Sequence, residues 1–162
     1  MSREKTISER GKFKFEITPA LYKNKDIVEL ILGNTSGLSQ GQVREQFKEH
    51  VQSHFFIDDT ITEKSTYIFY DVIFPKLGAN IKDCRVIMYA ICHRDILDDY
   101  EKEGFYGNRA DILAEMIADT LLNDDDVANS FGIGKLNLDS LDVYNSLRFY
   151  GVILTFNVPN FR

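Results

Sequence analysis

Three stretches of the chain carry apolar residues at helical spacing, and each begins behind a polar residue that can cap a helix. The most regular one follows Asn108, with Asp111 at the third helical position, and its apolar residues recur every three or four positions up to Leu121. The other two follow Asp26 and Ser39, each with a Glu or Gln three residues later that can complete a capping box. The pattern therefore predicts three helices, over approximately residues 26–33, 39–53 and 108–123.

Aromatic and β-branched residues predict strands in much of the remaining chain. Tyr67–Phe74 has this composition, and we expect Pro75 to end the strand because proline cannot donate to a sheet ladder. Ile81–His93 has apolar residues on both faces, which is typical of a central strand. A strand edge led into by Leu136 and a long final strand over Leu147–Val158 complete the set. Glycine-rich segments predict turns at residues 78–80 and 132–134.

The N-terminal residues show a different alternation. Phe13, Phe15 and Ile17 alternate with charged residues, which predicts a short strand or an extended arm over residues 1–18. Pro19 then favours the start of a helix, because proline is well suited to the first helical position.

The order of these elements indicates one α+β domain over residues 1–162, with a mainly antiparallel sheet flanked by helices. The hydrophobic content is 44%, with 12% aromatic residues, which excludes a disordered chain. A chain of this length is large enough to bury one substantial core. No repeat or linker-like segment divides it.

The formal net charge is −6, with 25 acidic residues against 19 Lys and Arg. Nucleic-acid binding depends on Lys and Arg that displace counterions, so this balance disfavours a nucleic-acid-binding protein. Because no signal pattern and no apolar run near ~18 residues is present, we expect a soluble protein of a reducing cytoplasm without a membrane partner. Bases crowd the N-terminal end, which indicates an ordinary solvated terminus or a contact with an acidic partner. They are Arg3, Lys5, Arg10, Lys12 and Lys14.

The residues offer little catalytic or metal-binding chemistry. His50 and His54 lie four apart on a predicted helix, but the zinc motif needs a Glu where this chain has Val51, and no third ligand is evident. Cys84 and Cys92 fall in one predicted strand, where their Cα atoms would be ~26 Å apart at ~3.3 Å per residue, too far for a disulfide. We therefore expect no catalytic residue, no metal site, no cofactor and no enzyme activity.

Candidate interface residues cluster around the helix that begins after Asn108. Arg109 is a cation in the first turn, where the helix dipole disfavours it, so we expect a carboxylate partner on its own chain or on a neighbouring subunit. The carboxylates nearby in the sequence are Asp95, Glu103 and Asp111. Phe105, Tyr106 and Phe131 lie in predicted loops beside this helix, and aromatic residues in polar loops are enriched at interfaces, although packing against their own core is the alternative.

The second half of the chain also resembles a known group of proteins. The resemblance lies in the order of five segments between Tyr67 and Phe161: Arg85–His93, the acidic loop after it, Gly107–Leu113, Gly132–Leu138 and Arg148–Phe161. This order is similar to that of tail terminator and related neck proteins, the head-tail joining proteins of long-tailed phages and phage tail-like particles. The resemblance implies an α+β subunit with no catalytic residues, which assembles into a ring of six copies.

The same resemblance implies a structural role in the virion. The ring would cap the tail tube, contact tube or sheath proteins on one side and head or collar proteins on the other, and assemble in the cytoplasm of the host bacterium. DNA would pass through such a ring without specific binding, and an acidic ring suits this because like charges do not adhere. An alternative is a monomeric acidic binding module, such as an immunity protein that sequesters a basic toxin.

Overall fold

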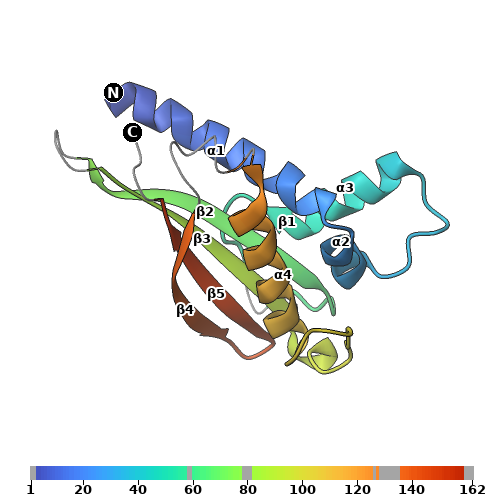
Figure 1. The fold of residues 1–162 in the computed structure, drawn as a ribbon. Coiled ribbons are helices and arrows are strands. Elements are labelled where there is room, and N and C mark those ends of the chain that lie inside the picture. The colour runs from blue at the N-terminus through green and yellow to red at the C-terminus, as the bar shows by residue number, and fades with distance from the viewer. Residues whose placement is uncertain (1–2, 58–59, 78–81, 126, 128–135, 159–162) are drawn as a thin grey trace.

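A computed structural model describes residues 3–57, 60–77, 82–125, 127 and 136–158 (Figure 1). These residues form four α-helices and a five-stranded sheet, which confirms the α+β class. The helices are α1 (Arg3–Lys23), α2 (Lys25–Leu32), α3 (Gln40–His50) and α4 (Arg109–Asn123), with a short 3-10 turn, η1, at Arg94–Ile96. The strands are β1 (Val51–Gln52), β2 (Thr66–Leu77), β3 (Lys82–His93), β4 (Asn137–Asn145) and β5 (Phe149–Asn157). The predicted turns at 78–80 and 132–134 lie outside the described residues.

The strands are arranged in the order β1-β2-β3-β5-β4, and every neighbouring pair is antiparallel except β1 and β2. β3 is paired on both sides, as its apolar pattern predicts. The helices cover one face of the sheet, with α4 crossing it diagonally and α1 running beside β2 (Figure 1). One edge of the sheet is formed by the short strand β1 and by the part of β2 that β1 does not cover. The other edge is formed by β4.

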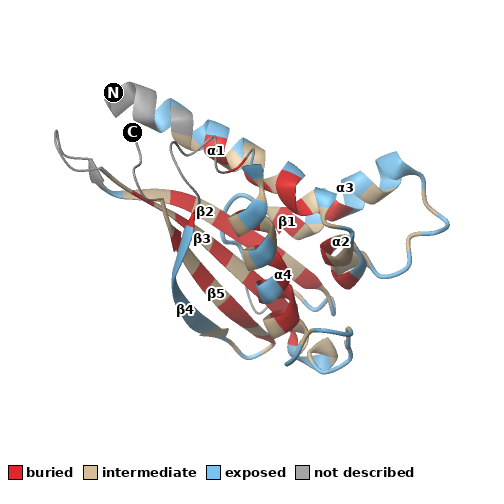
Figure 2. Ribbon diagram, viewed as in Figure 1, coloured by how far each residue is buried: buried red, intermediate tan, exposed pale blue. Residues whose placement is uncertain are grey.

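The main core lies between the sheet and the helices. Alternate residues of β3 from Cys84 to Cys92 face this core, together with Val152, Leu154 and Phe156 of β5. A smaller cluster on the opposite face is built around Phe69, Ile91 and Phe149. Figure 2 shows the buried positions alternating along β2, β3 and β5, whereas β4 is exposed almost throughout.

The extended arm predicted for residues 1–18 is wrong, because residues 3–23 form α1. Phe13 and Ile17 are both buried, and Leu21 continues the series at a spacing of four, which is the spacing of one helix face. Phe15, which an alternating strand would place beside them, is 77% exposed. Pro19 lies inside α1 and does not begin it. Apolar residues two positions apart fit a strand, but the first and third of them are four positions apart, which also fits a helix. The short alternating segment is therefore compatible with both structures.

Other boundaries also differ from the sequence interpretation. The helix predicted over residues 39–53 ends at His50, and Val51–Gln52 form β1. Pro75 does not end β2, because the register of β2 against β3 shifts between Ile73 and Lys76, and proline is tolerated where the ladder is interrupted. Helix α2 is capped by Asn24 and not by Asp26; the Asn24 side chain accepts hydrogen bonds from the backbone N–H of two following residues. The capping box predicted for α3 is confirmed, and so is the Asn108 cap predicted for α4, where Asp111 completes a capping box.

Candidate functional site

Arg109 is tied to its own chain. Its Nε and Nη1 donate to the backbone oxygens of Ile96 and Leu30 at 3.1 and 2.9 Å, and its guanidinium lies 5.1 Å from the centre of the Tyr100 ring. No carboxylate of the described residues lies within ion-pair distance, so the predicted carboxylate partner is wrong for the isolated chain. Leu30 lies near the C-terminus of α2, whose partial negative charge offsets the unfavourable dipole at the start of α4. Arg109 therefore joins α2, η1 and α4.

The other predicted interface residues differ in how far they are exposed to solvent. Phe105 is half-buried and packs against the main core. Tyr106 is 86% exposed in the loop before α4, so its ring is available to a partner. Phe131 lies outside the described residues. The structure thus brings Arg109, Phe105 and Tyr106 into one region, and of these only Tyr106 is fully presented to solvent.

The two histidines do not converge on a common point of coordination. His50 places Nδ1 3.0 Å from the backbone oxygen of Thr66 and stacks on Tyr67, while His54 is exposed. Within the described ranges, no group of three His, Cys, Asp or Glu residues is arranged to hold a metal. Burial raises the pKa of the Cys84 thiol to about 12 and that of Cys92 to about 11, so neither free thiol is activated as a nucleophile.

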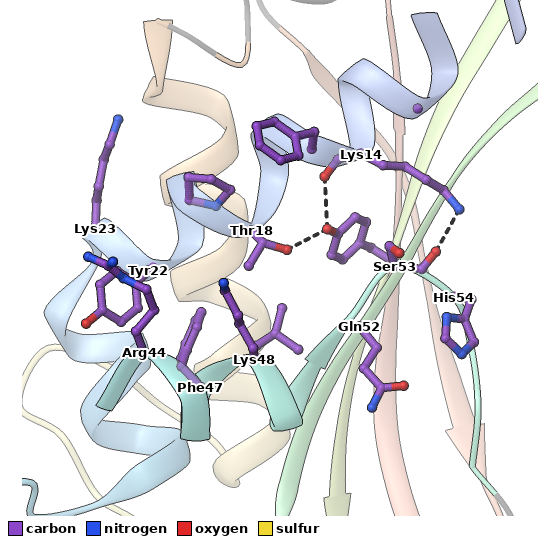
Figure 3. A pocket seen from close by; sticks show the side chains of 15 residues that line it. Lys14, Thr18, Tyr22, Lys23, Arg44, Phe47, Lys48, Gln52, Ser53 and His54 are labelled. Carbon is purple, nitrogen blue, oxygen red and sulfur yellow. Dashed lines mark hydrogen bonds between the residues drawn. The ribbon is translucent and has the colours of Figure 1, made fainter. Parts of the chain in front are cut away.

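A groove of about 870 Å³ lies between α1, α3 and β1 (Figure 3). Its inner surface is largely apolar and aromatic, formed by side chains that include Phe15 and Tyr22 of α1 and Phe47 of α3. Tyr22 and Phe47 contact each other edge to face, with ring centres 5.2 Å apart. Phe15 is largely exposed, so the groove presents an aromatic side chain to solvent. A surface of this kind is suited to apolar side chains of a partner.

The rim of the groove is basic, although the chain as a whole is acidic. Lys14 and Lys23 of α1 and Arg44 and Lys48 of α3 line it, and no Asp or Glu does. Figure 3 shows Arg44 beside Tyr22 and Lys48 rising from α3 toward the middle of the groove, whereas Lys23 extends from α1 away from the other side chains. The Arg44 guanidinium lies 5.8 Å from the centre of the Tyr22 ring. The groove therefore combines an apolar interior with a positive border.

Beside the groove, the outer side of β2 is occupied by other parts of the chain; we call this side the covered edge. His50 lies against the backbone oxygen of Thr66, and β1 pairs with the two residues at Ile68 and Phe69. Farther along, Arg10 Nε donates to the Val72 oxygen at 2.6 Å. The carboxylate of Asp71 accepts from the Val72 N–H at 2.8 Å.

Two bases of α1 hold Asp71 in this position. Arg10 Nη2 and Lys14 Nζ lie 2.5 and 2.8 Å from Asp71 Oδ1. Partial burial by itself would raise the pKa of Asp71, but the hydrogen bonds from Lys14 and Val72 and the charges of Lys14 and Arg10 outweigh it and hold the pKa below its usual value. Two of the N-terminal bases thus have an acidic partner within their own chain. The sequence could not reveal this partner because Arg10 and Asp71 are sixty-one residues apart.

The other end of the sheet is different; we call the outer side of β4 the open edge. In the part of the chain that the structure describes, β4 pairs with β5 on one side and with no strand on the other. Leu138, Leu141 and Val143 are 44%, 61% and 54% exposed. They pair with the core residues Phe156, Leu154 and Val152, so their side chains lie on the helix-covered face of the sheet but beyond the reach of the helices. An exposed strand of nine residues with uncovered aliphatic side chains is a template for pairing with another chain.

Comparison with protein families identifies the origin of this fold. The YomW family model matches residues 21–158, which is most of the chain. The chain belongs to the YomW family. YomW is a phage-derived protein of a Bacillus SPbeta-like prophage, so the chain has a phage-related origin. The match includes all five strands and helices α2, α3 and α4. Comparison with curated proteins gave no match, and no helix in the described part of this YomW family member has the length and apolar character to cross a membrane.

Proposed function

We propose that this YomW family member is a structural subunit of a phage particle. In this proposal it acts as a tail terminator-like protein, which forms a ring of six copies, caps the tail tube and joins it to the head or collar. The ring, its number of copies and its position come from the resemblance in the order of elements between residues 67 and 161. The phage-related origin of the family supports the setting.

The observation that carries the proposal is the open edge. Natural sheets protect their edge strands, because unpaired backbone groups attract other strands. This chain protects the covered edge with β1, Arg10 and Asp71, yet leaves β4 with exposed Leu138, Leu141 and Val143. Such an edge is suited to contact with another subunit, because association would remove this apolar surface from water.

The proposal is tested by the mass of the purified full-length chain and by the phenotype of its deletion. We expect a native mass of six times 18.7 kDa and ring-shaped particles in electron micrographs. Deletion of the gene from an inducible phage should leave tails that are not joined to heads. A chain that stays monomeric and does not associate with tail tubes would refute the proposal. A monomer that binds one basic protein in a one-to-one complex would favour the acidic binding module.

A single pair of variants separates the open edge from a general surface effect. Leu141→Lys places a charge on the open edge, and Ile7→Lys makes the same kind of change at an aliphatic side chain of α1. The two side chains are 61% and 69% exposed, so neither change should unfold the subunit. We expect Leu141→Lys to abolish the ring and Ile7→Lys to leave it intact.

A further inference from the structure

We propose that the groove between α1 and α3 receives the β4 strand of a neighbouring copy, so that the copies join head to tail. This inference rests on the proposed ring function and specifies its interface. It assigns the basic, apolar groove and the open edge to one contact.

The positions of the two surfaces permit this arrangement. The groove lies beside β1 at one end of the strand order, and β4 is the last strand at the other end. A contact between two different surfaces of the same subunit is heterologous, and repetition of such a contact closes into a ring when the rotation allows.

The charges of the two surfaces are complementary. β4 carries Asp139 and Asp142, which are both exposed, and it contains no Lys or Arg. The groove has Arg44 and Lys48 on the facing side of α3, and neither forms an ion pair with a carboxylate of the described residues. Pairing of β4 with a second β4 would instead bring aspartates close to aspartates, which is unfavourable. The charges therefore favour a contact of β4 with the groove.

The apolar parts and the lengths also match. Leu138 and Leu141 are exposed aliphatic side chains on β4, and the groove offers the aromatic side chains of Phe15 and Tyr22. Along α1, the lining residues run from Gly11 to Lys23, a length of ~18 Å at ~1.5 Å per residue. A strand covers the same length with five or six residues at ~3.4 Å each. This is about the length of the β4 segment that carries both leucines and both aspartates.

Charge-reversed variants test the contact. The groove variant is Arg44→Glu with Lys48→Glu, and the edge variant is Asp139→Lys with Asp142→Lys; all four side chains are exposed. We expect each variant alone to lose the ring and to run as a monomer. A chain that carries all four substitutions has its charges complementary again and should regain the ring. Matched controls at exposed positions outside both surfaces are Lys12→Glu with Lys25→Glu, and Glu115→Lys with Asp119→Lys.

Mixing the two monomeric variants gives the sharpest result. In the mixture, the unchanged β4 of the groove variant meets the unchanged groove of the edge variant, and the reversed β4 of the edge variant meets the reversed groove of the groove variant. Both contacts are complementary in charge, so the two variants can alternate around a ring. We expect a mixed ring in native mass spectrometry, with three copies of each variant, whereas each variant alone stays monomeric. Formation of the mixed ring also shows that both variants are folded.

The outcomes separate this inference from the proposed function. If the wild-type chain forms the ring and both charge-reversed variants also form it, the groove contact is wrong and the ring function stands. If the variants lose the ring but their mixture stays monomeric, the two surfaces do not meet and the inference is overturned. If the wild-type chain is itself monomeric and does not associate with tail tubes, the proposed function fails and the inference fails with it.

Discussion

The two edges of the sheet differ in whether other parts of the chain cover their outer side. At the covered edge, β1 pairs with β2, and the Arg10 side chain donates a hydrogen bond to the backbone oxygen of Val72. The Asp71 carboxylate accepts a hydrogen bond from the Val72 N–H. At the open edge, β4 has no strand neighbour on its outer side among the described residues, and its aliphatic side chains are exposed. The proposed ring would account for the difference, because it assigns the open edge to contact with another subunit.

The largest expected effect concerns the helix that covers the first edge. Phe47 of α3 is fully buried and contacts Tyr22 of α1, so Phe47→Ala would leave a cavity beneath the groove. We expect a loss of ~3–5 kcal/mol in the free energy of unfolding, measured by urea denaturation. A loss below ~1 kcal/mol would mean that α3 is only loosely attached and contributes little to covering this edge.

A smaller effect is expected at the ion pairs of the covered edge. Asp71→Asn removes the charge that Arg10 and Lys14 share, while the amide keeps an oxygen for the Val72 N–H. Because these side chains are partly exposed, we expect a loss of only ~0.5–1.5 kcal/mol in unfolding free energy near neutral pH. Asp119→Asn, at an exposed position of α4, is the control and should be neutral. Equal stability of the two variants would show that Asp71 does not help to hold α1 at this edge.

The same substitution should depend on pH in a defined direction. The folded-state pKa of Asp71 lies below the ordinary value of 3.8, so ionised Asp71 stabilises the fold above that value. The difference in stability between wild type and Asp71→Asn should be constant near neutral pH, shrink as the pH falls below 3.8, and disappear below the folded-state pKa. Urea denaturation at a series of pH values measures it. A difference that grows on acidification would contradict the assigned ion pairs.

The smallest expected effect on the isolated subunit is at the open edge. Leu141→Ala removes an aliphatic side chain that is 61% exposed, so the unfolding free energy of the monomer should change by less than ~0.5 kcal/mol. The same substitution should weaken the ring, because it removes apolar surface from the subunit contact. Unfolding of dilute monomer and the mass at high concentration measure the two effects separately. A loss of more than ~2 kcal/mol in the monomer would place Leu141 in the core of its own chain.

Much of the fold could be predicted because its signals are local. The capping box of Asn108 and Asp111 with the periodic apolar residues after it identified α4, and apolar residues on both faces identified β3 as a central strand. Phe13 and Ile17 were misassigned because a short alternating segment fits a strand and a helix equally well. Only the burial of one face decided between the two.

The groove could not be predicted, because it is formed by residues far apart in the sequence. The groove joins Lys14 and Tyr22 of α1 to Arg44 and Lys48 of α3, and neither helix shows alone that the bases will face one cavity. Leu141 also has the alternating apolar pattern of a half-buried strand, and it is exposed only because the helices stop short of β4. The basic N-terminal residues were a visible signal, but their acidic partner, Asp71, was recognisable only in the folded chain.

Hydrogen exchange of the backbone amides tests the difference between the two edges most directly. It should be measured on the full chain at a dilution that gives monomer and at a concentration that gives the assembled state. We expect the outward-facing amides of β4 to exchange quickly in the monomer and to become protected on assembly, while amides of β2 near Val72 are protected in both states. If β4 remains equally exchangeable in the assembled state, or if new protection appears only elsewhere, the open edge is not the surface through which copies of this chain associate.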